Sequence, residues 1–205
     1  AYDNDEGPNT GGMGAISPAP ALNQDLIRII KEEIIIPTIQ GMKSEDMEYE
    51  GILYAGIMLT KDGPKVIEFN CRFGDPETQV VLPRLKTDLV EIIKRSVEKN
   101  IKDFEIELIE DTAITVVLAS KGYPGSFKKL INLPSLNKFE KSKDITIYHS
   151  GTSINNEQNL VSNGGRVLCI TSLGENIQSC RKKAYDVINE INWENGFYRK
   201  DIGRL

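Results

Sequence analysis

Three polar side chains of different chemistry stand at alternate positions in one short run. Glu68, Asn70 and Arg72 directly follow an apolar pair. Residues two apart share a face of a β-strand, so the three would point the same way if the strand extends to Arg72. Carboxylate and amide oxygens suit Mg²⁺, which also takes water and substrate phosphates as ligands, and arginine binds phosphoryl oxygens with a permanently charged fork. The run predicts one wall of a magnesium-phosphate site, and a strand ending in a solvated turn is the alternative.

A glycine-rich segment near the start of the chain is the second candidate site. Its residues are Asn9, Thr10, Gly11, Gly12, Met13 and Gly14. Glycine permits positive φ and close approach of the backbone, so this loop can bring several N–H groups to an anion or a carboxylate. It lacks the lysine of a phosphate-binding Walker loop and is not a dinucleotide-binding fingerprint after a strand. A plain surface turn is the alternative, although so many glycines carry an entropic cost that a simple turn does not require.

Four other residues could do chemistry but have simpler interpretations. His149 is the only histidine, and no serine or cysteine nucleophile signature accompanies it, so we expect a structural role. Cys71 would face the side of the strand opposite Asn70, as a small core residue. Arg199 and Lys200 are either a solvated pair or a phosphate clamp, and composition does not decide between these.

Composition excludes several classes of protein. The 205 residues fit one large domain or two small ones, and a net charge of -5 argues against a general binder of nucleic acids or membrane surfaces. The chain contains no run of about 18 apolar residues, so we expect no membrane-spanning helix. The acidic start is not a signal peptide, and three scattered cysteines fit a reducing compartment, so we expect a cytoplasmic protein. A glycine-rich motif so near a start without methionine predicts the C-terminal part of a longer polypeptide.

The first half of the chain should position both candidate sites. We expect a loop over residues 3–20, a helix that begins near Asn23, and either a kink or a second helix at Pro37. Residues 51–60 and 65–70 predict a hairpin around a turn at 61–64. A helix should run from Thr87 or Asp88 to Asn100, with one face made of Leu89, Ile92, Ile93, Ser96 and Val97.

The second half predicts a separate small module. Residues 101–107 look like a connector, and strands are expected at 112–120, 145–149 and 165–172. A helix over 175–190 would pack Ile177, Tyr185, Val187, Ile188 and Ile191. We therefore expect an α+β fold with a boundary between residues 104 and 105.

Several longer strings resemble those of one enzyme family. They are Gly7 to Ala15 with its NTGGMGA core, Gly51 to Thr60, Val66 to Gln79 with its RFGDPETQ core, Gly122 to Gly125, His149 to Thr152, Asn163 to Leu168, and Arg199 to Gly203. In these strings the chain resembles the phosphoribosylamine–glycine ligase family, the glycinamide ribonucleotide synthetases. The strings span the whole chain in the family's order.

The resemblance implies a fold and a reaction. The family has the ATP-grasp fold, so residues 1–104 would be the C-terminal part of that domain, an antiparallel sheet with helices, and 105–205 a small α+β C-terminal domain. ATP would phosphorylate the glycine carboxylate, and the amine of 5-phosphoribosylamine would attack the acyl phosphate, giving glycinamide ribonucleotide, ADP and phosphate. The reaction would require magnesium or manganese. The N-terminal half that grips ATP from the other side would be missing, so this chain alone should not turn over.

The resemblance also implies roles for the candidate residues. Glu68 and Asn70 fall on the metal-ligand positions, and Arg72 falls where an arginine lies near the γ-phosphate and the acyl phosphate. Residues 9–14 would lie beside the acceptor site, and Arg199 and Lys200 would bind a ribose phosphate. Two alternatives remain: an ATP-grasp carboxylate–amine ligase with another acceptor, and a non-catalytic fragment that serves as a scaffold or binding module.

Overall fold

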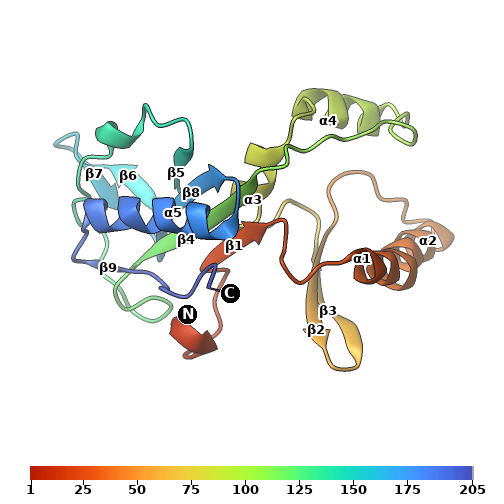
Figure 1. The fold of residues 1–205 in the computed structure, drawn as a ribbon, viewed down its shortest axis with the longest axis horizontal. Coiled ribbons are helices and arrows are strands. Elements are labelled where there is room, and N and C mark those ends of the chain that lie inside the picture. The colour runs from red at the N-terminus through yellow and green to blue at the C-terminus, as the bar shows by residue number, and fades with distance from the viewer. Residues whose placement is uncertain (205) are drawn as a thin grey trace. The chain divides into compact units, whose positions relative to one another are not determined.

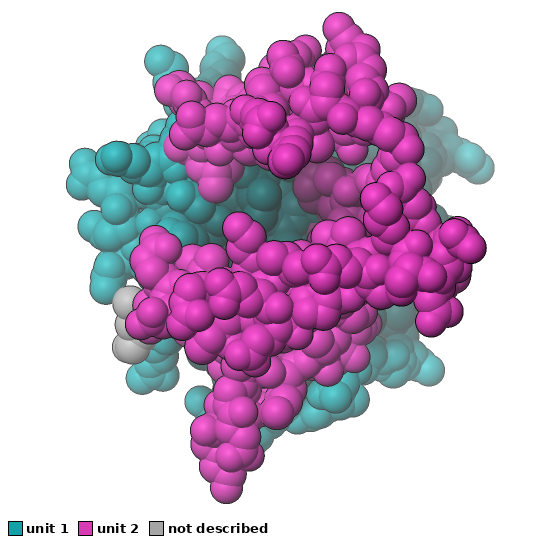
Figure 2. Space-filling view, turned by 90° about the vertical axis from the view of Figure 1, so that its right-hand side faces the viewer, with its two compact units in different colours: residues 1–18, 75–84, 109–205 teal, residues 19–74, 85–108 magenta. Residues whose placement is uncertain are grey.

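The computed structural model describes residues 1–204, which form two compact units. We call Ala1–Pro18, Asp75–Arg84 and Ile109–Leu205 the sheet unit, and Ala19–Gly74 and Leu85–Leu108 the hairpin unit. Figure 2 colours the two units separately. Each unit draws on segments that are distant in sequence, and the chain passes from the hairpin unit to the sheet unit for the last time after Leu108. These units are not the two predicted domains, and the predicted domain boundary between residues 104 and 105 remains a proposal.

The sheet unit is built on an antiparallel sheet of five strands. Its order is β1 (Gly14–Ser17), β4 (Thr112–Ser120), β8 (Arg166–Gly174) and β5 (Ile145–His149), and β9 (Gly196–Phe197) pairs with the end of β4. Every residue of β4 is buried, as expected of a central strand rich in β-branched residues. Thr171 and Thr115 face each other across β8 and β4 and share a buried hydrogen bond of 2.9 Å. The strands predicted at 112–120 and 145–149 are confirmed, and the third, predicted at 165–172, runs from Arg166 to Gly174.

One helix covers one face of this sheet (Figure 1). Helix α5 spans Ile177–Ile191, and the Asn176 side chain caps it by accepting from the Ser179 N–H at 2.9 Å. Its apolar residues recur at helical spacing, so Val187, Ile188 and Ile191 join Ile114 and Ile170 in the main core. The helix predicted from 175 to 190 is confirmed, although it begins at Ile177 and ends at Ile191.

The other face of the sheet carries a smaller apolar cluster of Met13, Val117, Ala119 and Cys169. Helix α3 (Thr78–Val81) and the 3-10 turn η3 (Leu82–Arg84) belong to the same unit. The buried Arg84 guanidinium donates to the Asp111 carbonyl and the Ser17 hydroxyl, at 2.6 and 2.8 Å. Further short elements of the unit are η1 (Asp3–Asp5), η4 (Asn137–Phe139), β6 (Thr152–Ile154) and β7 (Leu160–Ser162).

The loop predicted over residues 3–20 is therefore partly wrong. Gly14–Ser17 form strand β1, whose residues pair with the first half of β4 in register from Gly14 with Val116 to Ser17 with Ala113. The segment is short and lies between glycine and proline, so its own residues favour a turn. Pairing with a fully buried strand overrides that preference.

The hairpin unit contains β2 (Tyr54–Thr60) and β3 (Gly63–Asn70), an antiparallel pair. Its helices are α1 (Gln24–Ile30), α2 (Ile36–Ser44) and α4 (Leu89–Val97), and the π-helical segment η2 (Lys31–Ile35) joins the first two. Asn23 caps α1, Pro37 lies in the first turn of α2, and Asp88 caps α4, so these predictions are confirmed.

The prediction for α4 is wrong at its C-terminal end. The helix ends at Val97 and not at Asn100. Of its predicted apolar face, Ile92 is buried, whereas Ile93 is 50% exposed and Val97 is 71% exposed. Apolar residues at helical spacing mark a face that can be buried, but within residues 1–204 little covers this part of it. No helix in the described part of the chain is long and apolar enough to cross a membrane.

Candidate functional site

The three alternating polar residues of the hairpin unit contact one another. Asn70 donates from Nδ2 to Glu68 Oε1 at 2.9 Å, and Arg72 donates from Nη2 to Asn70 Oδ1 at 3.3 Å. Strand β3 ends at Asn70, so the condition that the strand extend to Arg72 is not met. The Arg72 side chain still reaches back to Asn70, and its Nη1 donates to the Phe73 carbonyl at 2.8 Å. The structure thus brings all three predicted side chains into one hydrogen-bonded chain.

This cluster fits a divalent cation that is shared with a phosphate. Glu68 keeps one carboxylate oxygen outside the bond to Asn70, and Glu68 and Arg72 are both exposed. No group of three or more histidine, cysteine or acidic residues within residues 1–204 could hold a metal ion by itself. One carboxylate and one amide oxygen match an ion such as Mg²⁺, which takes most of its ligands from water and substrate phosphates.

Two other residues singled out in the sequence lie outside this cluster. Cys71 is exposed, so its prediction as a core residue is wrong: it follows the end of β3, where alternation of faces no longer applies. His149 is the last residue of β5, and its Nδ1 lies 3.0 Å from the Thr152 hydroxyl. That hydrogen bond is what a structural histidine needs.

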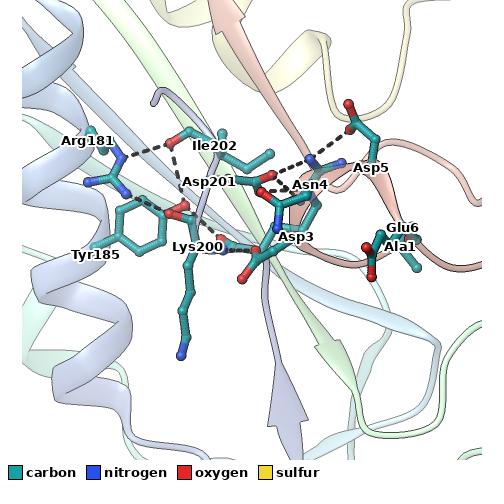
Figure 3. A network of polar contacts seen from close by, with 11 residues as sticks. Ala1, Asp3, Asn4, Asp5, Glu6, Arg181, Tyr185, Lys200, Asp201 and Ile202 are labelled. Carbon is teal, nitrogen blue, oxygen red and sulfur yellow. Dashed lines mark hydrogen bonds and ion pairs between the residues drawn. The ribbon is translucent and has the colours of Figure 1, made fainter. Parts of the chain in front are cut away.

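The glycine-rich loop lines a small pocket in the sheet unit. The pocket has a volume of about 180 Å³, and its walls are Asn9, Thr10, Gly11, Gly12, Met13 and Arg199, with Ala1, Asp5 and Gly7. Arg199 and most of the loop, nearly two hundred residues apart in sequence, are therefore brought together. Gly14 belongs to β1 and is not among the lining residues. Lys200 is also absent from the lining, and Figure 3 shows its side chain pointing away from the contacts around it.

The loop needs its glycines because other groups pack directly against them. A Cβ on Gly11 would lie 3.0 Å from Arg166 Cζ, and a Cβ on Gly12 would lie 2.5 Å from Pro76 Cδ. Neither glycine has a positive φ. Glycine permits both positive φ and close approach of other groups to the backbone, and here only the close approach explains why these two residues are glycines.

Arg166 holds the loop from the first position of β8. Its Nη1 donates to the Gly12 carbonyl at 3.1 Å and to the Asp75 carbonyl at 2.9 Å, and its Nη2 lies 2.6 Å from Asp75 Oδ2. Sequence reasoning gave Arg166 no role. The available signal was an arginine next to Gly164 and Gly165, within a string shared with the family that the chain resembles.

Arg199 is already surrounded by acidic groups. Its Nε and Nη2 donate to the two oxygens of Asp201 at 2.8 and 2.6 Å, and Nη2 also donates to Asp5 at 2.8 Å. The hydrogen bonds from Arg199 hold the pKa of Asp201 well below its usual range, and those to Asp201 raise the pKa of Arg199. A phosphate in this pocket would have to share the guanidinium with these carboxylates.

The backbone next to Arg199 is held as well. The Tyr185 hydroxyl donates to the Arg199 carbonyl at 2.7 Å, and burial raises the pKa of Tyr185 to about 12. The Lys200 N–H donates to Asp3 Oδ1 at 2.6 Å. Arg181 donates to the carbonyls of Lys200 and Ile202 at 2.6 and 3.1 Å. The segment that carries Arg199 and Lys200 is thus fixed by residues from both ends of the sheet unit.

Comparison with known proteins points to one family. The family model of the phosphoribosylglycinamide synthetase ATP-grasp (A) domain matches residues 1–78, and that of the phosphoribosylglycinamide synthetase C domain matches residues 113–205. The chain is 47% identical over 201 residues to phosphoribosylamine–glycine ligase of Caldanaerobacter subterraneus subsp. tengcongensis, which covers 98% of this chain and 47% of that protein. It is 48% identical over 202 residues to the trifunctional purine biosynthetic protein adenosine-3 of Gallus gallus, covering 98% of this chain and 20% of that protein.

Solved structures agree with this. The crystal structure of phosphoribosylamine–glycine ligase from Thermotoga maritima matches with a TM-score of 0.84 and 34% identity, over 98% of this chain and 49% of that one. An L-amino acid ligase from Bacillus licheniformis matches with a TM-score of 0.60 at 15% identity, over 95% of this chain and 46% of that one, which shows likeness of fold alone. The chain spans about half the length of the single-function relatives it matches.

Proposed function

This chain belongs to the phosphoribosylglycinamide synthetase family, and on that premise we propose that its protein ligates glycine to 5-phosphoribosylamine in purine biosynthesis. ATP would phosphorylate the glycine carboxylate, and the amine would displace phosphate from the glycyl phosphate to give glycinamide ribonucleotide. The fold is the C-terminal part of an ATP-grasp fold followed by a small α+β domain. The observation that carries the proposal is the hydrogen-bonded chain of Glu68, Asn70 and Arg72, inside the segment that matches the ATP-grasp domain.

Each member of this chain has a proposed role. Glu68 and Asn70 would hold Mg²⁺ or Mn²⁺, which when bound neutralises charge on the phosphates of ATP. Arg72 is the proposed catalytic residue, because phosphoryl transfer is accelerated mainly by positive groups aimed at oxygens where charge develops. Its bond to Asn70 keeps the guanidinium next to the metal ligands. The remaining grip on ATP would come from the half of the enzyme that this chain does not span.

The pocket of the sheet unit is the proposed acceptor side. Residues 9–14 would offer backbone N–H groups to the substrate, and Arg199 and Lys200 would contribute charge toward a ribose phosphate. Their support differs: Arg199 lines the pocket with the loop, whereas the Lys200 side chain points away from its neighbours. The domain division at residues 104 and 105 and a cytoplasmic location belong to the same proposal.

A coupled ADP-release assay on the full-length protein tests this function. We expect ADP release only when ATP, a divalent metal, glycine and phosphoribosylamine are all present, with glycinamide ribonucleotide as the product. Turnover with a different amine acceptor would favour another ATP-grasp carboxylate–amine ligase. A folded full-length protein with no acceptor-dependent ADP release would favour the scaffold or binding module.

A further inference from the structure

We propose that Arg166 is a positioning residue for the substrate loop, acting through Asp75 and Gly12; this rests on the proposed function. Arg166 makes three contacts with two separate segments. It donates to the Gly12 carbonyl in the loop, and it binds both the carbonyl and the carboxylate of Asp75, at 3.1, 2.9 and 2.6 Å. One guanidinium therefore fastens the glycine-rich loop to the segment that follows the RFG string.

The packing around this contact leaves little freedom. The guanidinium lies against Gly11, where a Cβ would come within 3.0 Å of Arg166 Cζ, and Gly12 lies against Pro76, which is fully buried. The Arg166 side chain is 19% exposed. The backbone of Gly11 and Gly12 thus runs between Arg166 and Pro76, so a shift of either would move the residues that line the pocket.

Asp75 is itself oriented from its other side. Gln79 donates from Nε2 to Asp75 Oδ1 at 3.0 Å, so each carboxylate oxygen of Asp75 has its own partner. The same amide nitrogen lies 3.7 Å from Cys169 Sγ. Gln79 Oε1 is buried with no hydrogen-bond partner in the described chain, and turning the amide over would set an oxygen against the carboxylate. Gln79 therefore fixes the carboxylate oxygen of Asp75 that Arg166 does not bind.

The chemistry requires arginine and makes Arg166 a positioning residue. A planar fork can bind a carboxylate and two carbonyls at fixed angles, whereas lysine offers one point of charge on a flexible stem. Arg166 is not among the residues that line the pocket, and its hydrogen bonds go to Gly12 and Asp75, so we infer that it acts on the loop and not on a phosphate. Its effect on turnover should pass through the loop and appear mainly in the use of the substrate that this loop contacts.

The test uses the full-length enzyme with Arg166→Lys, Arg166→Gln and Asp75→Asn. We expect Arg166→Gln to lower kcat/KM for phosphoribosylamine by roughly tenfold to a hundredfold, because small misplacements have such effects, while KM for ATP stays unchanged. Arg166→Lys should recover part of the loss. Asp75→Asn should resemble Arg166→Gln, and the double variant should add little, as expected of two groups that act as a unit.

A second measurement separates positioning from folding. Deuterium exchange of the full-length enzyme should become faster in peptides covering residues 7–13 in Arg166→Gln, and stay unchanged in those from β4 and β8. Arg28→Gln and Arg28→Lys are the controls, because Arg28 also pairs with a carboxylate but is 59% exposed. Unchanged kcat/KM for phosphoribosylamine in Arg166→Gln, or equal losses for all substrates with faster exchange in β4 and β8, would overturn the inference. If the wild-type enzyme shows no phosphoribosylamine-dependent turnover, the proposed function fails, and unchanged exchange at residues 7–13 would separately overturn the role of Arg166.

Discussion

Arg199 and Asp201 form a two-point ion pair, in which Nε lies 2.8 Å from Oδ1 and Nη2 lies 2.6 Å from Oδ2. The guanidinium also donates to Asp5, and the Asp201 carboxylate accepts the Asn4 N–H at 2.8 Å. Both paired side chains are 17% exposed, so water screens this pair less than one on the open surface. The pair fastens the first residues of the chain to the last ones beside the candidate acceptor pocket.

Asp201 should make the stability of the sheet unit depend on pH. The hydrogen bonds from Arg199 lower the pKa of Asp201 in the folded protein. Such a group stabilises the fold above its unfolded pKa, about 3.9, and this contribution is lost as the pH falls through the folded pKa. We expect Asp201→Asn to lower the free energy of unfolding by about 1.5–3 kcal/mol near neutral pH, with a deficit that shrinks below about pH 4.

Urea unfolding followed by tryptophan fluorescence measures this effect. Trp193 is the only tryptophan, lies in the sheet unit and is 8% exposed, so its signal reports on this unit. Asp186→Asn is the matched control, because Asp186 is 55% exposed in a surface pair with Lys182 and should change stability little. A deficit for Asp201→Asn that is the same at pH 7 and pH 3 would contradict the assignment.

Arg72→Ala should reduce turnover without disturbing the fold. Arg72 is exposed, and its partners are Asn70 Oδ1 and the Phe73 carbonyl. Removal of one group that stabilises transition-state charge typically lowers kcat by about 10²–10³, and we expect a loss in this range for the full-length enzyme. Arg28→Ala should keep normal activity. A folded Arg72→Ala enzyme with near-normal kcat would remove Arg72 from the mechanism.

Glu68→Gln should weaken the use of the metal ion. The substitution keeps the shape of the side chain and removes the charge that a divalent cation prefers. We expect the Mg²⁺ or Mn²⁺ concentration for half-maximal rate to rise roughly 10- to 100-fold, the range found even for residues that only support metal ligands. The measurement is a metal titration of the full-length enzyme at fixed ATP, after removal of metal by a chelator. Glu32→Gln, at an exposed surface pair, should titrate as the wild type does.

Gly12→Ala should disturb function, whereas Gly41→Ala should not. A Cβ at Gly12 would lie 2.5 Å from Pro76 Cδ, whereas a Cβ at Gly41, inside α2, meets nothing within 4 Å. We expect Gly12→Ala to displace the loop and to reduce kcat/KM for phosphoribosylamine. Gly41→Ala should leave kinetics unchanged and raise helix stability by about 0.5–1 kcal/mol. Steady-state kinetics and thermal unfolding of both variants check the pair; normal kinetics for Gly12→Ala would show that the loop tolerates the shift.

The 205-residue chain alone should not turn over. It spans 47% of the bacterial ligases to which it is 45–47% identical, and ATP-grasp enzymes hold ATP between two subdomains. The measurement is the coupled ADP-release assay with glycine and phosphoribosylamine, run beside the full-length enzyme at equal concentration. Sustained ADP release by the purified chain at rates typical of enzymes, with kcat around 1 s⁻¹ or more, would refute this prediction.

Elements with strong local signals were predictable from the sequence. Strand β4 is a run of β-branched and apolar residues, α5 repeats its apolar positions at helical spacing, and Asn23, Asp88 and Asn176 cap helices with their own side chains. Strand β1 was not predictable in this way, because its strand conformation depends on pairing with a segment about a hundred residues later. The end of α4 was missed because the chain leaves the helix at Glu98, and Lys99 takes a positive φ of 57° that a lysine does not predict.

The candidate sites divide along the same line. Glu68, Asn70 and Arg72 are two residues apart, so their spacing alone indicated that they would meet, although β3 stops before Arg72. Contacts of short range can be predicted from the types and spacing of neighbouring residues. Other contacts join distant residues: Arg166 binds Asp75, which is 91 positions away, and Arg199 binds Asp5, which is 194 positions away. Such pairs depend on the order of the strands in the sheet, and that order cannot be predicted from a local pattern of charge or hydrophobicity.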